Sequence, residues 1–128
     1  MELTLQQILD ISGAADIAAN AKMPSRTAYT ITIWKRKVKD YAEAYGEAHY
    51  ALVEKYAPVS DPENPRNFIF NGADGKPDAA KCAAFVAERN ALLAVVQDVE
   101  LRAVKVSDFD GAELPPAFFQ LCEPLITD

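Results

Sequence analysis

One uninterrupted helical pattern constrains the fold of this chain more than any other feature. Pro24 and Pro58 bound it, and no proline stands between them. Because proline disfavours a helical residue before it and cannot continue a helix, one helix is predicted from Ser25, its N-cap, to Tyr56. Apolar side chains recur along it at alternating spacings of three and four residues, which places them on one face. They are Ile31, Trp34, Val38, Tyr41, Tyr45, Ala48 and Leu52.

This apolar stripe predicts helix–helix packing. A helix of about 30 residues is roughly 45 Å long at 1.5 Å per residue, so it must project, pack along its length or pair with another copy. The stripe suits a partner helix of the same chain and one of a second copy. We expect both, because the helix predicted to follow is shorter. The chain is therefore predicted to form a homo-oligomer through Ile31, Trp34, Val38, Tyr41, Tyr45 and Leu52.

Shorter helices are predicted on both sides of the long one. The first covers Leu3 to Lys22, with Thr4 as its N-cap. Residues 57–78 form a connector rich in proline and glycine, and Asp78 caps a third helix from Ala79 to Gln97. Two helices joined by such a connector most simply form an antiparallel hairpin. The prolines at 115 and 116 begin a short last helix over 117–122.

Two segments have the pattern of strands. One is short and lies inside the connector, from Asn67 to Phe70. The other alternates apolar and charged residues from Val99 to Val106, and we expect the two to pair. The predicted fold is α+β, mainly α, with a small antiparallel sheet of two or three strands. At 128 residues the chain is expected to be a single domain, 1–128.

Composition limits the partners that this surface attracts. The formal net charge is −6, so the surface as a whole repels nucleic acid and anionic membranes, and neither is expected as a partner. No apolar run reaches the length of a membrane span, and the first residues lack the features of a signal peptide. A cytoplasmic location is therefore expected.

The two cysteines, Cys82 and Cys122, lack the paired spacing of a zinc site. Both lie among apolar residues and are expected to be buried free thiols. A disulfide would require that the two positions meet in an oxidising compartment.

The sequence contains no recognisable catalytic constellation. His49 is the single histidine, and no serine or cysteine stands in a nucleophile-elbow pattern. The glycines near Asn71 lack the spacing of a phosphate-binding loop and the lysine followed by serine or threonine that ends one. The acids of the connector are too irregular for a calcium loop; they are Asp61, Glu63, Asp74 and Asp78. We therefore expect no enzyme activity, no cofactor and no metal.

The start of the long helix carries a cluster of cations in an otherwise acidic chain. Five lie within fourteen residues, interleaved with aromatic rings: Arg26, Lys35, Arg36, Lys37 and Lys39. A helix N-terminus attracts anions, and guanidinium groups next to rings can hold a phosphate and a base. The predicted ligand-binding residues are Ser25, Arg26, Tyr29, Lys35 and Arg36. In the alternative interpretation these cations are only the solvated back of an amphipathic helix.

In the order of its motifs, nearly the whole chain resembles a family of small phage and prophage proteins of unknown function. The motifs are Lys22–Tyr29, Leu52–Tyr56, Val99–Leu101 and Leu114–Ile126. The chain departs from that family in its many alanines and in Trp34. The resemblance implies a phage origin and provides no catalytic residues to transfer.

Three roles compete under a phage origin. The first is a non-enzymatic, anti-defence sponge that sequesters a nucleotide-derived immune signal, of cyclic nucleotide or ADP-ribose type, in the cytoplasm of the infected host. The second is a small virion or tail assembly component, which needs only the stripe and a structural partner. The third is an inhibitor of a host protein whose acidic surface mimics nucleic acid. The sponge ranks first because it uses both the cation cluster and the stripe.

Overall fold

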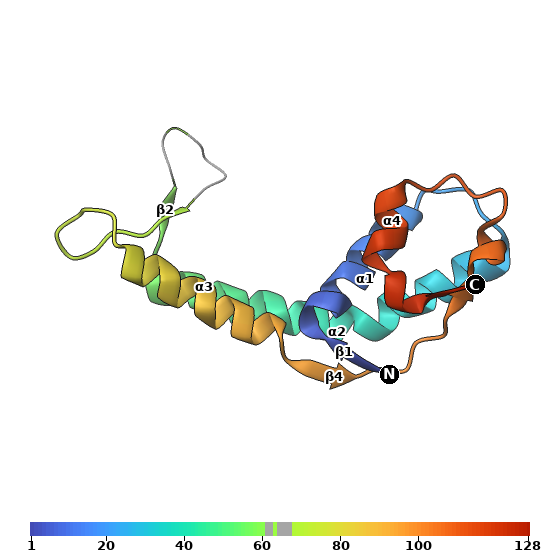
Figure 1. Cartoon of the computed structure of the whole chain (residues 1–128), viewed down its shortest axis with the longest axis horizontal. Helices are drawn as coiled ribbons and strands as arrows, with labels where there is room; N and C mark the ends of the chain where they lie inside the picture. The colour runs from blue at the N-terminus through green and yellow to red at the C-terminus, as the bar shows by residue number, and fades with distance from the viewer. Residues whose placement is uncertain (61–62, 64–67) are drawn as a thin grey trace. The chain divides into compact units, whose positions relative to one another are not determined.

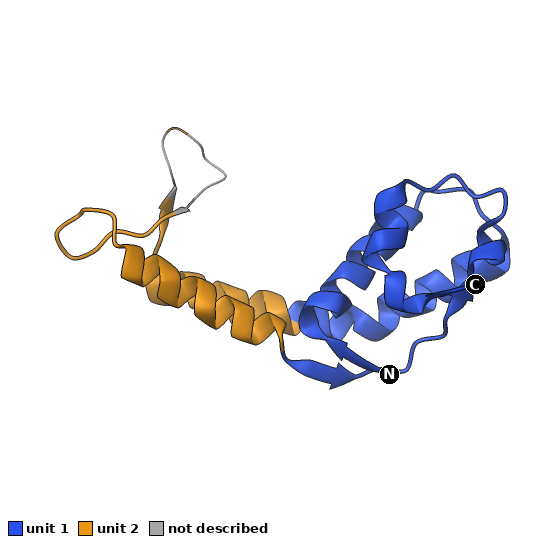
Figure 2. Ribbon diagram, in the orientation of Figure 1, with its two compact units in different colours: residues 1–43, 95–128 blue, residues 44–94 orange. Residues whose placement is uncertain are grey.

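The computed structural model describes residues 1–60, 63 and 68–128 (Figure 1). Most of these residues are helical, and the strands are short, which confirms an α+β, mainly α, fold. The helices are α1 (Leu5–Ala18), α2 (Ser25–Tyr56), α3 (Ala79–Leu93) and α4 (Pro116–Leu121). The chain groups into two compact units, coloured in Figure 2: unit 1 comprises Met1–Glu43 and Val95–Asp128, and unit 2 comprises Ala44–Ala94. Because α2 belongs partly to each, a single domain over 1–128 stays a prediction.

Helix α1 begins with the predicted cap. Thr4 accepts a hydrogen bond from the Gln7 backbone N–H at 3.2 Å, and the Gln7 side chain accepts one from the Thr4 N–H at 2.9 Å. The helix is shorter than predicted at both ends. Leu3 instead belongs to strand β1 (Glu2–Thr4), and the chain turns after Ala18.

Unit 1 contains a closely packed core. Helix α4 packs on α1, and three phenylalanine rings meet edge to face with centroids 5.2–5.5 Å apart: Phe109, Phe118 and Phe119. The largest fully buried side chains come from β1, α1, α2, α4 and the residues that follow α4. They are Leu3, Ile8, Ile11, Trp34, Val38, Phe118, Cys122 and Leu125.

Within residues 1–60, 63 and 68–128, the strands form three separate pairs. In unit 1, β1 pairs antiparallel with β4 (Val96–Asp98), and β5 (Val104–Lys105) pairs parallel with β6 (Ile126–Thr127). In unit 2, β2 (Val59–Ser60) pairs antiparallel with β3 (Phe68–Ile69). Short 3₁₀ turns, η1 (Val106–Phe109) and η2 (Glu123–Leu125), follow β5 and precede β6. Two of the three pairs are therefore antiparallel.

The predicted pairing of 99–106 with 67–70 is wrong. The backbone carbonyls of Glu100 and Arg102 accept hydrogen bonds from side chains of α2, and not from another strand. Phe68 pairs within its own unit, and Asn67 lies outside the described residues. Helix α3 ends at Leu93, before the predicted limit, because the residues up to 98 are needed for pairing with β1.

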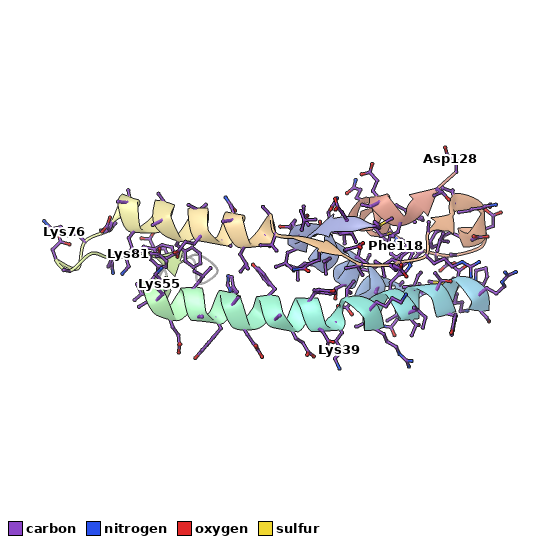
Figure 3. The ribbon with its side chains drawn as sticks, turned by 90° about the horizontal axis from the view of Figure 1, so that it is seen from below. Lys39, Lys55, Lys76, Lys81, Phe118 and Asp128 are labelled. Atoms are coloured by element: carbon purple, nitrogen blue, oxygen red, sulfur yellow. The ribbon has the colours of Figure 1, made fainter. Side chains whose placement is uncertain are left out.

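Unit 2 joins the last turns of α2 to α3, as expected for the predicted hairpin (Figure 3). Lys55 forms an ion pair with Glu88 at 2.8 Å, and the Phe85 ring contacts the rings of His49 and Tyr56. Asp78 caps α3 as predicted, accepting from the Lys81 N–H at 3.1 Å. The exposed residues of α3 carry no charge; they are Ala79, Ala80, Ala83, Ala84, Ala87, Asn90 and Ala91.

The core of unit 2 is thin. Among its described residues, only Phe70 and Phe85 are buried apolar side chains. Their rings lie 4.9 Å apart at the centre of the unit's aromatic contacts. Throughout the described part of the chain, no helix combines the length and the apolar character needed to cross a membrane.

Candidate functional site

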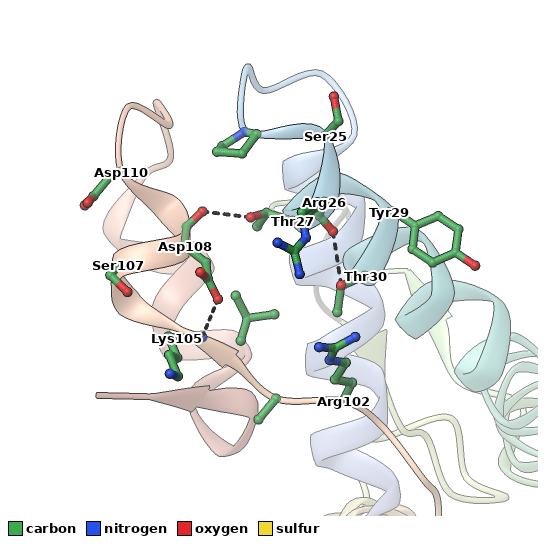
Figure 4. A pocket seen from close by; sticks show the side chains of 13 residues that line it. Ser25, Arg26, Thr27, Tyr29, Thr30, Arg102, Lys105, Ser107, Asp108 and Asp110 are labelled. Atoms are coloured by element: carbon green, nitrogen blue, oxygen red, sulfur yellow. Dashed lines mark hydrogen bonds between the residues drawn. The ribbon is translucent and has the colours of Figure 1, made fainter.

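A pocket of about 640 Å³ opens beside the first turns of α2, wholly within unit 1 (Figure 4). One wall is the start of α2, from Ser25 to Thr30. The other is the segment 102–110, which contains β5 and the turn η1. Because both walls belong to unit 1, the geometry of the pocket is set within that unit.

Three cationic side chains line the pocket. Arg26 comes from α2, Arg102 precedes β5, and Lys105 ends β5. All three residues are exposed, and none takes part in the ion pairs found among the described residues. Their positive charge is therefore available to a ligand, next to the positive end of the α2 dipole.

Side chains of α2 hold the second wall in place. The Thr27 hydroxyl donates to the Asp108 carbonyl at 2.7 Å, and the Trp34 indole N–H donates to the Arg102 carbonyl at 2.7 Å. Thr27 is the one buried polar residue in the described part of the chain, and Trp34 is fully buried. The Lys37 ammonium adds a bond of 2.9 Å to the carbonyl at position 100. These bonds fix the backbone that carries Arg102 relative to the helix that carries Arg26.

The pocket is not uniformly positive. Two acids, Asp108 and Asp110, also line it, and so does Ser107 of the turn η1. One Asp108 carboxylate oxygen accepts from the Lys105 backbone N–H at 3.2 Å, which shapes the turn after β5. In Figure 4 Arg26, Arg102 and Tyr29 lie on the side of α2, whereas Ser107 and Asp110 lie on the opposite side. A ligand in this pocket would meet both signs of charge.

The structure brings together three of the five residues predicted to bind a ligand. Ser25, Arg26 and Tyr29 line the pocket, and Tyr29 is 69% exposed at its edge. Ser25 is the first residue of α2 and not its N-cap, which is a correction. The carbonyl of Pro24 accepts the first helical bond, from the Ala28 N–H at 3.0 Å.

Lys35 and Arg36 lie away from this pocket. Lys35 forms an ion pair with Asp16 of α1, and Arg36 is not among the residues that line the pocket. The reason is helical periodicity: Lys35 follows Arg26 by about two and a half turns, which places it on the opposite face. The cations of the predicted ligand-binding cluster are therefore close in sequence but do not all face the same pocket.

Sequence reasoning missed the second wall. Arg102, Lys105, Asp108 and Asp110 are far from α2 in sequence, and the first two stood in a predicted strand. The alternation of that segment indicated charged residues on one side, but nothing in the sequence indicated that they would face Arg26.

The stripe on α2 divides into two parts. Ile31, Trp34 and Val38 are buried in unit 1, with exposed fractions of 4%, 0% and 0%. They are core residues and cannot also meet a second copy, which corrects the predicted interface. Tyr41, Tyr45 and Leu52 are half-buried and remain accessible in part.

The remaining candidates for chemistry have structural surroundings. His49 lies against the rings of Tyr45 and Phe85, with centroids 5.6 and 6.2 Å away. Both cysteines are free, as expected; Cys122 is buried, whereas Cys82 is half-buried. Burial raises the pKa of the Cys122 thiol to about 11, so it is a poor nucleophile at neutral pH.

Acidic residues in the described structure do not gather into a metal site. Residues 1–60, 63 and 68–128 contain no group of three His, Cys, Asp or Glu side chains that could hold a metal ion. Asp61, one of the connector acids, lies outside these residues.

In unit 2 the hydrogen bond from Lys55 lowers the pKa of Glu88, and that same bond raises the pKa of Lys55.

Comparison of the chain with protein-family models, curated proteins and solved structures gave no match. The resemblance to small phage proteins therefore stays a prediction. The class of site is defined by its geometry alone: a pocket with three unpaired cations and one exposed ring at the start of a helix.

Proposed function

We propose that this protein is a non-enzymatic binding protein whose unit 1 pocket takes a phosphate-bearing small molecule of nucleotide type. The observation that carries the proposal is that Arg26, Arg102 and Lys105 line one pocket and have no ion-pair partners among the described residues. Guanidinium groups bind phosphate oxygens through two parallel N–H bonds, and the helix N-terminus adds its own attraction.

The size and the edge of the pocket suit the same class of ligand. Pockets for small molecules typically measure ~300–1,000 Å³, and this one measures about 640 Å³. Tyr29 offers an exposed ring on which a base could stack. Among the lining residues there is no histidine or cysteine, which supports binding and not catalysis.

Under a phage origin, such a pocket favours the sponge over the other two roles. A virion component or an inhibitor that mimics nucleic acid needs a partner surface and has no use for a cationic pocket. The sponge would sequester a cyclic nucleotide or an ADP-ribose derivative in the cytoplasm of the infected host. Its ligand-binding residues would be Ser25, Arg26 and Tyr29, as predicted, together with Arg102 and Lys105.

Self-association is the second part of the proposal. Unit 2 has only two buried apolar side chains among its described residues, while Tyr45 and Leu52 stay half-exposed. Most of the exposed residues of α3 are alanines, and its charged residues, Lys81, Glu88 and Arg89, are half-buried, so a small-residue surface is available to a second copy. We therefore propose a homo-oligomer that associates through unit 2.

Calorimetric titration of three arginine variants tests the binding proposal. ADP-ribose and a cyclic dinucleotide serve as probes. Arg26→Ala and Arg102→Ala should each weaken binding at least about tenfold, which corresponds to roughly 1.4 kcal/mol. Arg36→Ala is the matched control, because it removes the same charge from the same helix outside the pocket. Equal losses in all three variants, or no binding by the wild type, would contradict the proposal.

A further inference from the structure

The mixed charge of the pocket limits the ligand further than its cations alone. On the basis of the proposed function, we infer that the ligand is a nucleoside phosphate whose phosphate meets Arg26 and Arg102 while its hydroxyl or amino groups donate to Asp108 and Asp110. A bare polyphosphate would not satisfy both sides of this pocket, because it has no groups that donate to the two carboxylates.

Each of the two carboxylates has oxygen atoms that can accept hydrogen bonds from a ligand. Asp108 uses one oxygen for the Lys105 N–H, and its other oxygen has no hydrogen-bond partner among the described residues. Asp110 is exposed, and its side chain forms no hydrogen bond or ion pair with the described part of the chain. An ionised carboxylate only accepts hydrogen bonds, so its natural partners are sugar hydroxyls and amino groups.

The same carboxylates penalise a ligand that carries only negative charge. A polyanion long enough to fill the pocket would place part of its charge beside Asp108 and Asp110, and like charges at close range repel. The two arginines and the two aspartates lie on different sides in Figure 4. A molecule with phosphate at one end and donors at the other matches this order, as a nucleoside phosphate does.

Three probes separate charge from hydrogen bonding. Pyrophosphate carries charge alone, ADP adds sugar hydroxyls and a base, and 2′,3′-dideoxy-ADP keeps the base and the charge without those hydroxyls. Calorimetry on the full chain should give the order ADP, dideoxy-ADP, pyrophosphate, from tightest to weakest. Each step should change the dissociation constant at least about tenfold, as expected for a lost hydrogen bond to a charged group.

Asp110→Ala supplies the decisive comparison. It should tighten pyrophosphate binding about two- to threefold by removing a like charge, and it should weaken ADP binding about tenfold by removing an acceptor. Asp40→Ala removes an acid from the exposed surface of α2 outside the pocket and should leave the ratio of the two affinities unchanged.

The outcomes distinguish this inference from the proposed function. If Asp110→Ala tightens both probes equally, the acids only repel, and the inference fails while phosphate binding stands. If pyrophosphate and ADP bind the wild type equally well, the donor contacts do not exist and the inference also fails. If none of the three probes binds, and if Arg26→Ala leaves the binding of ADP-ribose and of the cyclic dinucleotide unchanged, the proposed function itself is wrong.

Discussion

Trp34 links the core of unit 1 to the pocket wall, and replacing it tests that link. The indole ring is fully buried on α2, and its N–H donates to the Arg102 carbonyl at 2.7 Å. Trp34→Phe keeps an aromatic ring, removes the donor and leaves a small cavity. Both the free energy of unfolding and the position of Arg102 should respond.

The expected magnitude follows from two terms. Loss of ring volume from a closely packed core destabilises by about 1–2 kcal/mol for a change smaller than aromatic to alanine. The unpaired carbonyl adds about 1 kcal/mol, at the low end of the range because Arg102 itself is exposed and water can reach part of the group. Trp34→Phe should therefore lower the free energy of unfolding by about 2–3 kcal/mol, which leaves a typical domain folded.

Urea denaturation followed by far-ultraviolet circular dichroism measures this change without relying on tryptophan fluorescence. Replacing Trp34 with 3-benzothienylalanine keeps the bicyclic shape and puts sulfur in place of the N–H, so it isolates the hydrogen-bond term of about 1 kcal/mol. Lys37→Met is the control: it removes an exposed bond to the same segment and should change stability by less than about 0.5 kcal/mol.

The binding readout separates a positioning role from a merely structural one. If Trp34 holds Arg102 in place, the benzothienylalanine variant should bind pyrophosphate more weakly at a temperature where it is fully folded. A stability loss below about 1 kcal/mol for Trp34→Phe, with unchanged binding in both variants, would refute the reasoning.

Two further predictions concern single residues. Ala57 follows α2 with φ 43°, a backbone conformation that disfavours L side chains. Ala57→Gly should therefore raise the free energy of unfolding by about 0.5–1 kcal/mol, measured by thermal or urea denaturation. A loss of stability would contradict this. Because burial raises the pKa of Cys122 from 9.0 to about 11, its contribution to stability is complete below about pH 8.5 and is lost as pH rises through the folded pKa. Urea midpoints from pH 8 to 11 should therefore fall in the wild type and in Cys82→Ser, and an unchanged midpoint would contradict the shift.

Local signals in the sequence predicted helices well and strands poorly. The prolines flanking α2, the Thr4 and Asp78 caps and the prolines that begin α4 act within a few residues of their own positions, so sequence reasoning recovered them. The segment 99–106 alternated like a strand, but its paired part is Val104–Lys105, and side chains of α2 hold the carbonyls of Glu100 and Arg102. Tertiary contacts of this kind override alternation, because β propensity reflects packing more than an intrinsic backbone preference.

The candidate site was half predictable for a related reason. A helix N-terminus carrying Arg26 and Tyr29 is visible in sequence, and periodicity alone could have excluded Lys35, which lies on the opposite face. The partner wall could not be found in this way, because it depends on where residues 102–110 return to α2. The bonds of Thr27 and Trp34 to that segment hold it against α2, and each joins residues more than 60 positions apart.

Those two long-range bonds also bear on how strongly the pocket could bind. A ligand that must order its own site loses part of its binding free energy in fixing side chains and loops. Here the backbone of both walls is already joined by a buried hydroxyl and a buried indole. What remains to be ordered is the exposed side chains that line the pocket, so the backbone of the site is prepared for a small ligand before that ligand arrives.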